Sequence, residues 1–295
     1  MMNRLVSTIL ACLLSVTVFA EGVDRTIDAS PDGHVDVSNI SGSVEVTGWT
    51  QNTVRVTGTL GRNVEELILE RDGNKVIIKV KVPKQRGHSM GIDSDLRINV
   101  PQNSSIDVGT VSADIDVMDV TGDQGLHTVS GDVNTEHTGG DIRAESVSGD
   151  VEVTGDHADG EVSASSVSGD VRLIRLAGNV EVESVSGDVA VEDGSFQRAS
   201  LETVTGDLDF KGELRKGGKL TIDTVNGDVD AEFAGNVSAR FDIDTFNGNI
   251  RNCFGPKAEK SNKYGPGLEL EFTEGSGDGR VIISTLNGDV KICNK

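Results

Sequence analysis

The hexapeptide Ser146-Val147-Ser148-Gly149-Asp150-Val151 recurs along the chain and decides the expected fold. Similar phrases begin at Thr110, Thr128, Ser166, Ser184, Thr203, Thr224, Thr245 and Thr285, with a degenerate copy at Asn39. Between Thr110 and Thr245 the phrases start 18–21 residues apart, and 40 residues separate the last two. Repetition at this period is typical of a solenoid, in which each repeat forms one coil that stacks on the next.

The alternation of apolar and polar residues within a repeat predicts strands. We count positions from the first Ser or Thr of each phrase, which is position 0. Positions +1, +5 and +7 are mainly apolar, as in Val185, Val189 and Val191, and positions −4 and −2 often are. We expect these side chains to face inward, with two successive outward residues at −1 and 0 that form a corner. The Ser, Thr and Asn side chains at 0 and +2 then predict a solvated polar face.

Position +3 is glycine in nine of the ten repeats. We expect this residue to point inward, where a missing side chain lets a thin coil close around Val and Ile. The scarcity of aromatic residues (eight Phe, one Trp and one Tyr) also predicts a core without large rings. The glycines of the regular phrases are Gly131, Gly149, Gly169, Gly187, Gly206, Gly227, Gly248 and Gly288.

The predicted fold class is all-β: a single-chain parallel β-solenoid of about ten coils, with an antiparallel β insertion that caps its N-terminal end. A β-sandwich of antiparallel hairpins is the alternative, because regular short strands suit it as well. The expected segments are a signal peptide (1–20), an N-terminal strand and first coil (21–52), the antiparallel insertion (53–100), the regular repeats (101–252), an insertion with a basic loop and a hairpin around Gly275 (253–284), and a final coil (285–295).

Three stretches together resemble a known family. They are Val44–Trp49, Leu96–Pro101 and the repeated Thr/Ser-Val-Ser-Gly-Asp-Val phrases. This combination, over about residues 35–293, resembles the bacterial exported β-strand-repeat proteins called "putative adhesins", a domain of unknown function. The resemblance implies an extracytoplasmic repeat protein, and it carries over no catalytic residues.

The ends and the charge of the chain bear on its location and partners. Arg4, the apolar run Leu5–Phe19 and Ala20 form a signal peptide, so we expect a periplasmic, extracellular or envelope-attached protein. Cys12 offers a weaker lipoprotein alternative. No later segment is apolar enough to span a membrane. Forty-eight acidic residues against 27 basic ones argue against nucleic-acid binding. We expect a monomer.

Acidic residues form a column at position +4, which includes Asp132, Asp150, Asp170, Asp188, Asp207 and Asp228. Residues 101–252 carry thirty acidic and ten basic side chains, whereas 53–100 carry six and nine. Stacked carboxylates repel one another, which suggests bound Ca²⁺ as the only cofactor to consider. The interpretation that we favour over bound Ca²⁺ is that each carboxylate accepts hydrogen bonds from the backbone or from the Ser, Thr or Asn at +2 of an adjacent coil.

Two cysteines remain after signal cleavage, Cys253 and Cys293, and both occupy position +8. If they lie on adjacent coils their Cα atoms are close enough for a disulfide, which we predict. His127, His137 and His157 occur at unrelated offsets in or near the return loops, so we expect exposed histidines rather than a metal site.

No nucleophile elbow, zinc-protease motif or P-loop occurs in the sequence. We therefore expect a non-catalytic exported protein with a structural, adhesive or binding role, which presents an acidic face to an envelope protein or glycan. A divalent-cation-binding or envelope-stress protein is the alternative. An enzyme that acts on extracellular polysaccharide comes third.

Overall fold

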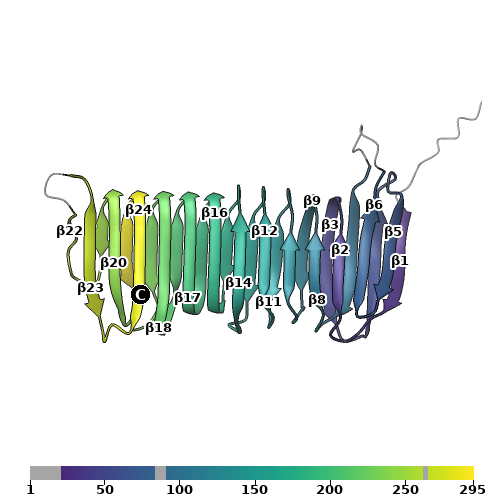
Figure 1. The fold of residues 1–295 in the computed structure, drawn as a ribbon, viewed down its shortest axis with the longest axis horizontal. Coiled ribbons are helices and arrows are strands. Elements are labelled where there is room, and N and C mark those ends of the chain that lie inside the picture. The colour runs from purple at the N-terminus through teal and green to yellow at the C-terminus, as the bar shows by residue number, and fades with distance from the viewer. Residues whose placement is uncertain (1–20, 84–90, 262–264) are drawn as a thin grey trace, which may run out of the picture.

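The computed structural model describes residues 21–83, 91–261 and 265–295. The signal peptide predicted at 1–20 lies outside these residues. The described chain is all-β, and its strands lie side by side in one long stack (Figure 1). This confirms the predicted fold class at the level of an all-β, solenoid-like protein.

Each coil contributes one strand to each of two long faces. On the first face lie β2 (His34–Ser38), β8 (Ser105–Gly109), β10 (Gln124–His127), β12 (Ile142–Ser146), β14 (Asp159–Ser166) and β16 (Ala177–Ser186). On the second face lie β3 (Ser41–Trp49), β9 (Ser112–Met118), β11 (Val133–His137), β13 (Val151–Gly155) and β15 (Val171–Ile174). Two longer strands, β17 (Val189–Thr205) and β18 (Leu208–Asn226), run from the second face to the first.

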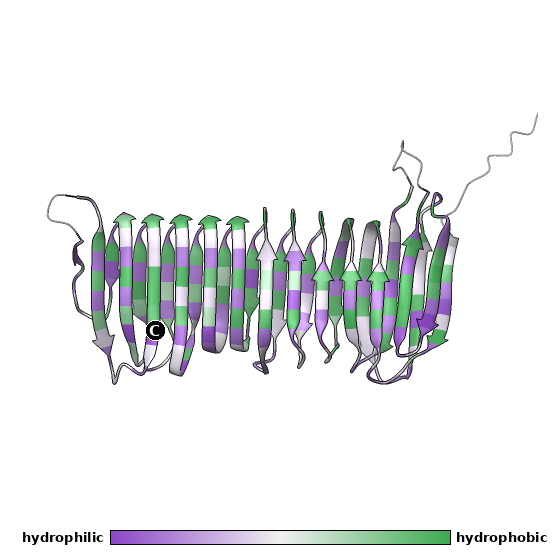
Figure 2. Ribbon diagram, viewed as in Figure 1, coloured by the Kyte–Doolittle hydropathy of each residue, from purple (hydrophilic) through white to green (hydrophobic). Residues whose placement is uncertain are grey.

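Equivalent positions of successive coils stack in register. Val151 pairs with Val171, and Val171 with Val189, in parallel strands. Buried Val, Leu and Ile side chains from both faces form one continuous core. The colours of Figure 2 alternate along the strands, as expected where one side of each strand is buried.

The corner between the two faces differs from the prediction. Position 0 is buried, as in Ser184, whereas position +1 is exposed, as in Val185. The two successive outward residues are therefore +1 and +2, not −1 and 0. Most of these buried hydroxyls are satisfied. Ser166 donates to the carbonyl oxygen of Gly149 at 2.9 Å, and the same bond forms at Ser146, Ser184, Thr203, Thr245 and Thr285, whereas Oγ1 of Thr224 has no partner among the described residues. Because the neighbouring coil supplies this acceptor, a small polar residue is accommodated inside while valine remains outside.

The role of the repeat glycines is also different from the one expected. A Cβ atom added to Gly187 would lie 2.1 Å from the carbonyl oxygen of Gly169 in the adjacent coil. The equivalent distance at Gly149 is 2.0 Å, to Gly131. The missing side chain is thus required along the stacking axis, where one coil approaches the next, and not toward the core.

Antiparallel strands occur at the N-terminal end of the stack. They involve β1 (Glu21–Asp28), β4 (Thr53–Leu60), β5 (Glu66–Asp72), β6 (Lys75–Lys81) and β7 (Ser94–Pro101). Strands β6 and β7 pair in parallel with β2 and β3 and so extend the stack by a coil. On their outer sides β5 pairs with β6, β4 with β7 and β1 with β4, all antiparallel. The stack is therefore of mixed orientation and not a purely parallel solenoid.

The C-terminal coils do not stack in chain order. The strands are β19 (Val229–Phe233), β20 (Ala239–Asn247), β21 (Ile250–Asn252), β22 (Glu259–Lys260), β23 (Leu268–Glu274), β24 (Gly279–Asn287) and β25 (Val290–Asn294). Strand β24 pairs in parallel with both β18 and β20, and β25 with both β19 and β21. The last coil of the sequence therefore lies between the two that precede it (Figure 1).

Strand β23 covers the outer side of β20 in antiparallel orientation and also pairs with β22. The hairpin expected around Gly275 is not formed, because β20 lies between β23 and β24. Phenylalanines fill this end of the core, contrary to the expectation of a core without rings. Phe196, Phe210 and Phe233 stack from coil to coil with centroids 5.8 and 5.7 Å apart, and Phe241 and Phe272 lie 4.5 Å apart.

Candidate functional site

The column of aspartates at position +4 runs the length of the regular coils. We call Asp114, Asp132, Asp150, Asp170, Asp188, Asp207, Asp228 and Asp289 the aspartate column; all are exposed. The backbone N–H of Asp170 donates to Oδ1 of Asp150 at 2.9 Å, and that of Asp188 donates to Oδ1 of Asp170 at 2.8 Å. The same bond links every neighbouring pair, and Asn249 continues the ladder from Asp289.

This ladder shows what offsets the repulsion between stacked carboxylates. At a coil spacing of about 4.8 Å two carboxylates repel by about 0.9 kcal/mol even in bulk water. Each carboxylate accepts a charge-assisted hydrogen bond from a backbone N–H of the next coil, and this attraction offsets the repulsion. Within residues 21–83, 91–261 and 265–295, no three His, Cys, Asp or Glu side chains gather as a metal site would require. The calcium ladder remains a prediction.

An acidic groove of about 430 Å³ lies beside the aspartate column on the second face. Its walls include Asp150, Asp170 and Asp188, together with Glu152 and Asp209 at position +6. Burial raises the pKa of Asp209, and the neighbouring Asp230 raises it further. We call this hollow the acidic groove. Arg172 also lines it, so the groove is acidic on balance and attracts cationic groups by its net charge.

A second row of carboxylates, at position −1 on the first face, was not recognised from the sequence. Glu183, Glu202 and Asp223 form this row, which we call the acidic flank. Burial raises the pKa of Glu202, and the nearby Asp223, Glu183 and Glu181 add to the rise. Burial also raises the pKa of Asp223. Position −1 is also acidic at Glu145 and Asp244, but it holds Gly109, His127, Ser165 or Ser284 in other coils, so the row is interrupted in the sequence. The three consecutive carboxylates were the one signal that could have shown it.

The three histidines are not brought together. His127 ends β10, and its Nδ1 lies 3.0 Å from Oε2 of Glu145 in the next coil. His137 ends β11, and His157 lies in a return turn with a φ of 68°. The expectation that they do not form a common metal site stays a prediction.

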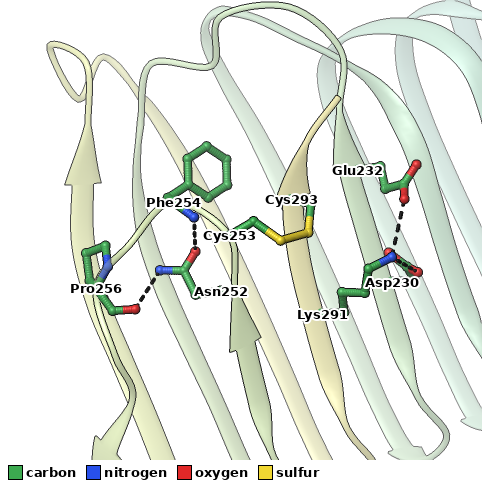
Figure 3. Close-up of a disulfide and its surroundings, with 8 residues drawn as sticks. All are labelled: Asp230, Glu232, Asn252, Cys253, Phe254, Pro256, Lys291 and Cys293. Carbon is green, nitrogen blue, oxygen red and sulfur yellow. Dashed lines mark hydrogen bonds and ion pairs between the residues drawn. A yellow bond between two sulfur atoms is a disulfide. The ribbon is translucent and has the colours of Figure 1, made fainter.

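The two cysteines do meet. A disulfide joins Cys253 and Cys293, with Cα atoms 4.8 Å apart (Figure 3). It confirms the predicted pairing and links the final coil to the coil that precedes it in the chain. Close by, Nζ of Lys291 lies 2.7 Å from Oδ2 of Asp230 and 3.3 Å from Oε1 of Glu232 (Figure 3). Asp230 and Glu232 raise the pKa of Lys291.

Two stretches that together span most of the chain, residues 33–189 and 175–293, match the profile of one protein family, described as Toastrack DUF4097. The chain belongs to this Toastrack family. The match includes the coils that carry both the aspartate column and the acidic flank, and it agrees with the resemblance found in the sequence. No curated protein matches the chain significantly.

Several solved structures are similar to this Toastrack protein. A "putative adhesin" from Parabacteroides distasonis is 13% identical, with a TM-score of 0.40, over 93% of this chain and 98% of that one. A "putative lipid binding protein" from the same species is 13% identical, with a TM-score of 0.38, over 92% and 96%. A "putative cell adhesion protein" from Clostridium sporogenes is 8% identical, with a TM-score of 0.31, over 93% and 100%.

The geometry determines what this surface can do. The aspartate column repeats the same chemistry at each regular coil, whereas the acidic flank is continuous only over the three coils of Glu183, Glu202 and Asp223. In the part of the chain that the structure describes, no helix is long and apolar enough to cross a membrane.

Proposed function

We propose that this Toastrack protein is exported and acts in the cell envelope as a non-catalytic binding scaffold. Its partner is an envelope protein or a glycan that carries cationic groups. The observation that carries the proposal is the aspartate column, in which neighbouring carboxylates are held in register by backbone hydrogen bonds of 2.8–3.0 Å. The disulfide supports export, because such bonds persist in oxidising compartments.

Pre-organisation makes this column suitable for binding. An exposed aspartate on a flexible loop loses rotamer freedom when it contacts a partner, whereas a carboxylate already hydrogen-bonded to the next coil loses less. The excess of thirty acidic over ten basic residues in 101–252 also creates a field that attracts cationic partners and accelerates encounter. Binding should therefore be fast and should weaken as salt is added.

The test measures binding of the mature chain, residues 21–295, to envelope fractions of the producing cell. The first variant combines Asp150→Asn, Asp170→Asn and Asp188→Asn, which keep the hydrogen-bond acceptors but remove three charges from the acidic groove. A matched control removes three charges from the return turns with Asp119→Asn, Asp156→Asn and Asp193→Asn; two of these, Asp119 and Asp193, have positive φ, which Asn tolerates.

We expect saturable, salt-sensitive binding that falls at least about tenfold in the groove variant, roughly 1.4 kcal/mol, and changes little in the control. Absence of saturable binding by the unaltered protein would contradict the proposal. Equal losses in the two variants would show that only net charge matters and would also contradict a specific role for the column.

Cation binding is the second candidate, and one observation favours it. The backbone ladder uses Oδ1 of each aspartate, so Oδ2 lies outside the ladder, and hard cations such as Ca²⁺ prefer carboxylate oxygens. If the column binds cations, Tb³⁺ luminescence saturates with the unaltered protein and is lost in the groove variant, while chelator lowers Tm. No saturable luminescence, with Tm unchanged by chelator, refutes this candidate.

A further inference from the structure

A continuous apolar surface runs along the corner of the stack at position +1. Among the residues that the structure describes, ten large hydrophobic side chains are exposed, and nine of them belong to this column, each 39–48% exposed. We call it the apolar ridge. In spatial order it consists of Val111, Val129, Val147, Val167, Val185, Val204, Val225, Leu286 and Phe246. Figure 2 shows the matching hydrophobic band along the edge where β16, β20 and β24 end.

The ridge is straight and rigid because the backbone on both of its sides is paired. Ser148 N donates to the carbonyl oxygen of Val129 at 3.0 Å, and Ser168 N to that of Val147 at 3.0 Å. At about 4.8 Å per coil, nine coils extend over about 40 Å. Monomeric soluble proteins rarely keep a contiguous exposed apolar surface of this extent unless it meets a partner.

A hollow accompanies the ridge on one side. Its volume is about 500 Å³, and it lies between Val167, Val185, Val204 and Val225 of the ridge and the acidic flank of Glu183, Glu202 and Asp223. On the other side of the ridge, beyond the polar residues at +2, runs the aspartate column. Over the coils of Val185, Val204 and Val225 the ridge is therefore an apolar stripe with carboxylates along both sides.

This charge pattern selects the class of partner. A second copy of the chain would bring two acidic flanks together, and an anionic lipid surface would be repelled in the same way. A partner with an apolar stripe bordered by Lys or Arg places unlike charges opposite each other on both sides. Charge complementarity thus favours a basic, amphipathic polypeptide.

The spacing along the ridge selects its conformation. An α-helix presents one turn every 5.4 Å, close to the coil spacing of about 4.8 Å. An extended strand repeats its side-chain orientation every 6.6–6.8 Å, which falls out of step with the coils within two or three repeats. Three or four turns of helix remain within about half a coil of register, long enough to cover the hollow.

We propose that the apolar ridge and the acidic flank bind a basic amphipathic helix of a partner protein. The apolar face of the helix packs on the valines of the ridge, and its Lys or Arg residues pair with the carboxylates on either side. This inference rests on the proposed binding function and specifies the partner and the surface.

The probe is a fluorescein-labelled synthetic helix of about 22 residues, built from Leu on one face and Lys on the other, titrated with the mature chain. A peptide of the same composition in scrambled order controls for charge alone.

The ridge variant combines Val167→Ser, Val185→Ser and Val204→Ser. The flank variant combines Glu183→Gln, Glu202→Gln and Asp223→Asn, and the control is the return-turn variant Asp119→Asn, Asp156→Asn and Asp193→Asn. Unchanged circular dichroism confirms that each variant is folded.

We expect the ridge and flank variants each to weaken binding at least about tenfold, the control to stay within about twofold, and the scrambled peptide to bind weakly. Binding by the ridge variant equal to that of the unaltered protein overturns the inference, as does a scrambled peptide that binds equally well. Two further results overturn it: dimers in sedimentation that the ridge variant abolishes, or ridge-dependent co-sedimentation with zwitterionic vesicles. If the helix does not bind while envelope fractions still do, the inference fails and the proposed function stands; if neither binds, both fail.

Discussion

The carbonyl oxygen of a repeat glycine serves two neighbours in the next coil. The hydroxyl of Ser184 donates to the carbonyl oxygen of Gly169 at 3.4 Å. The α-carbon of Gly187 approaches the same atom so closely that an added Cβ would lie 2.1 Å from it. One backbone atom therefore explains both the buried hydroxyl at position 0 and the glycine at +3.

Gly187→Ala should consequently destabilise the protein by about 3 kcal/mol, because backbone and not a flexible side chain blocks the new methyl group. Gly109→Ala is the matched control. No atom lies within 4 Å of a Cβ at Gly109, so its stability should change by less than about 1 kcal/mol. Urea unfolding measures both values, and equal effects would contradict the role assigned to the repeat glycine.

Glu202 gives the pH prediction at this scale. Because burial raises its pKa above the unfolded value, the folded state binds more protons between the two pKa values, and stability falls as pH rises through this window. Glu202→Gln should therefore raise Tm at pH 7, with the difference disappearing by about pH 4, near the ordinary pKa of Glu.

Asp24→Asn should act with the opposite sign. The hydrogen bond from Arg55 lowers the pKa of Asp24, so the ionised form stabilises the fold above the unfolded pKa. This variant should lower Tm at pH 7 and approach the unaltered protein as pH falls. Thermal melts from pH 3 to 7.5 test both variants, and shifts of the same sign would contradict the assignment.

At the scale of the element, the strands change faces at positions +1 and +2. Val185 lies two residues before the repeat glycine Gly187 and is exposed, whereas Val189, two residues after it, is buried. Both are valines in the same repeat, and they differ in burial because the corner turns the side chain at +1 outward and the one at +5 inward.

Val185→Ala should leave the free energy of unfolding within about 0.5 kcal/mol, since an exposed side chain loses little burial. Val189→Ala should destabilise by about 2 kcal/mol through lost burial and an unfilled cavity. Denaturant unfolding of the two variants measures the free energy of unfolding and so shows which of the two positions is buried. Equal losses would place position +1 in the core after all.

At the scale of the whole molecule, the final coil is enclosed by two others. Strand β24 has partners on both sides, and the disulfide ties its coil to the one outside it. Opening this end therefore requires two coil interfaces to separate. The disulfide restricts this in the unfolded state as well, because it closes a loop between residues 40 apart.

Cys253→Ser combined with Cys293→Ser should lower the stability of the C-terminal coils by up to about 4 kcal/mol on the loop-closure argument. Because coils in a stack interact mainly with their neighbours, the loss should be local. Hydrogen exchange should quicken in 239–294 and remain unchanged in 105–174. Uniform quickening along the stack would contradict a local clamp.

The sequence alone determined the period, the all-β class, the aspartate column and the pairing of Cys253 with Cys293, because these follow from residue types that recur at equal offsets. Tertiary structure decided which residue of the corner is buried. From residue type alone, the valine at +1 suits the core better than the Ser or Thr at 0. The hydroxyl at position 0 is the buried group because the glycine carbonyl of the adjacent coil accepts its hydrogen bond. It also decided the order of the coils. Because the repeats are alike, any coil could pair with any other, and the sequence does not determine which coils are neighbours. Long-range pairing of β24 with β18 and β20 places the last coil inside the stack.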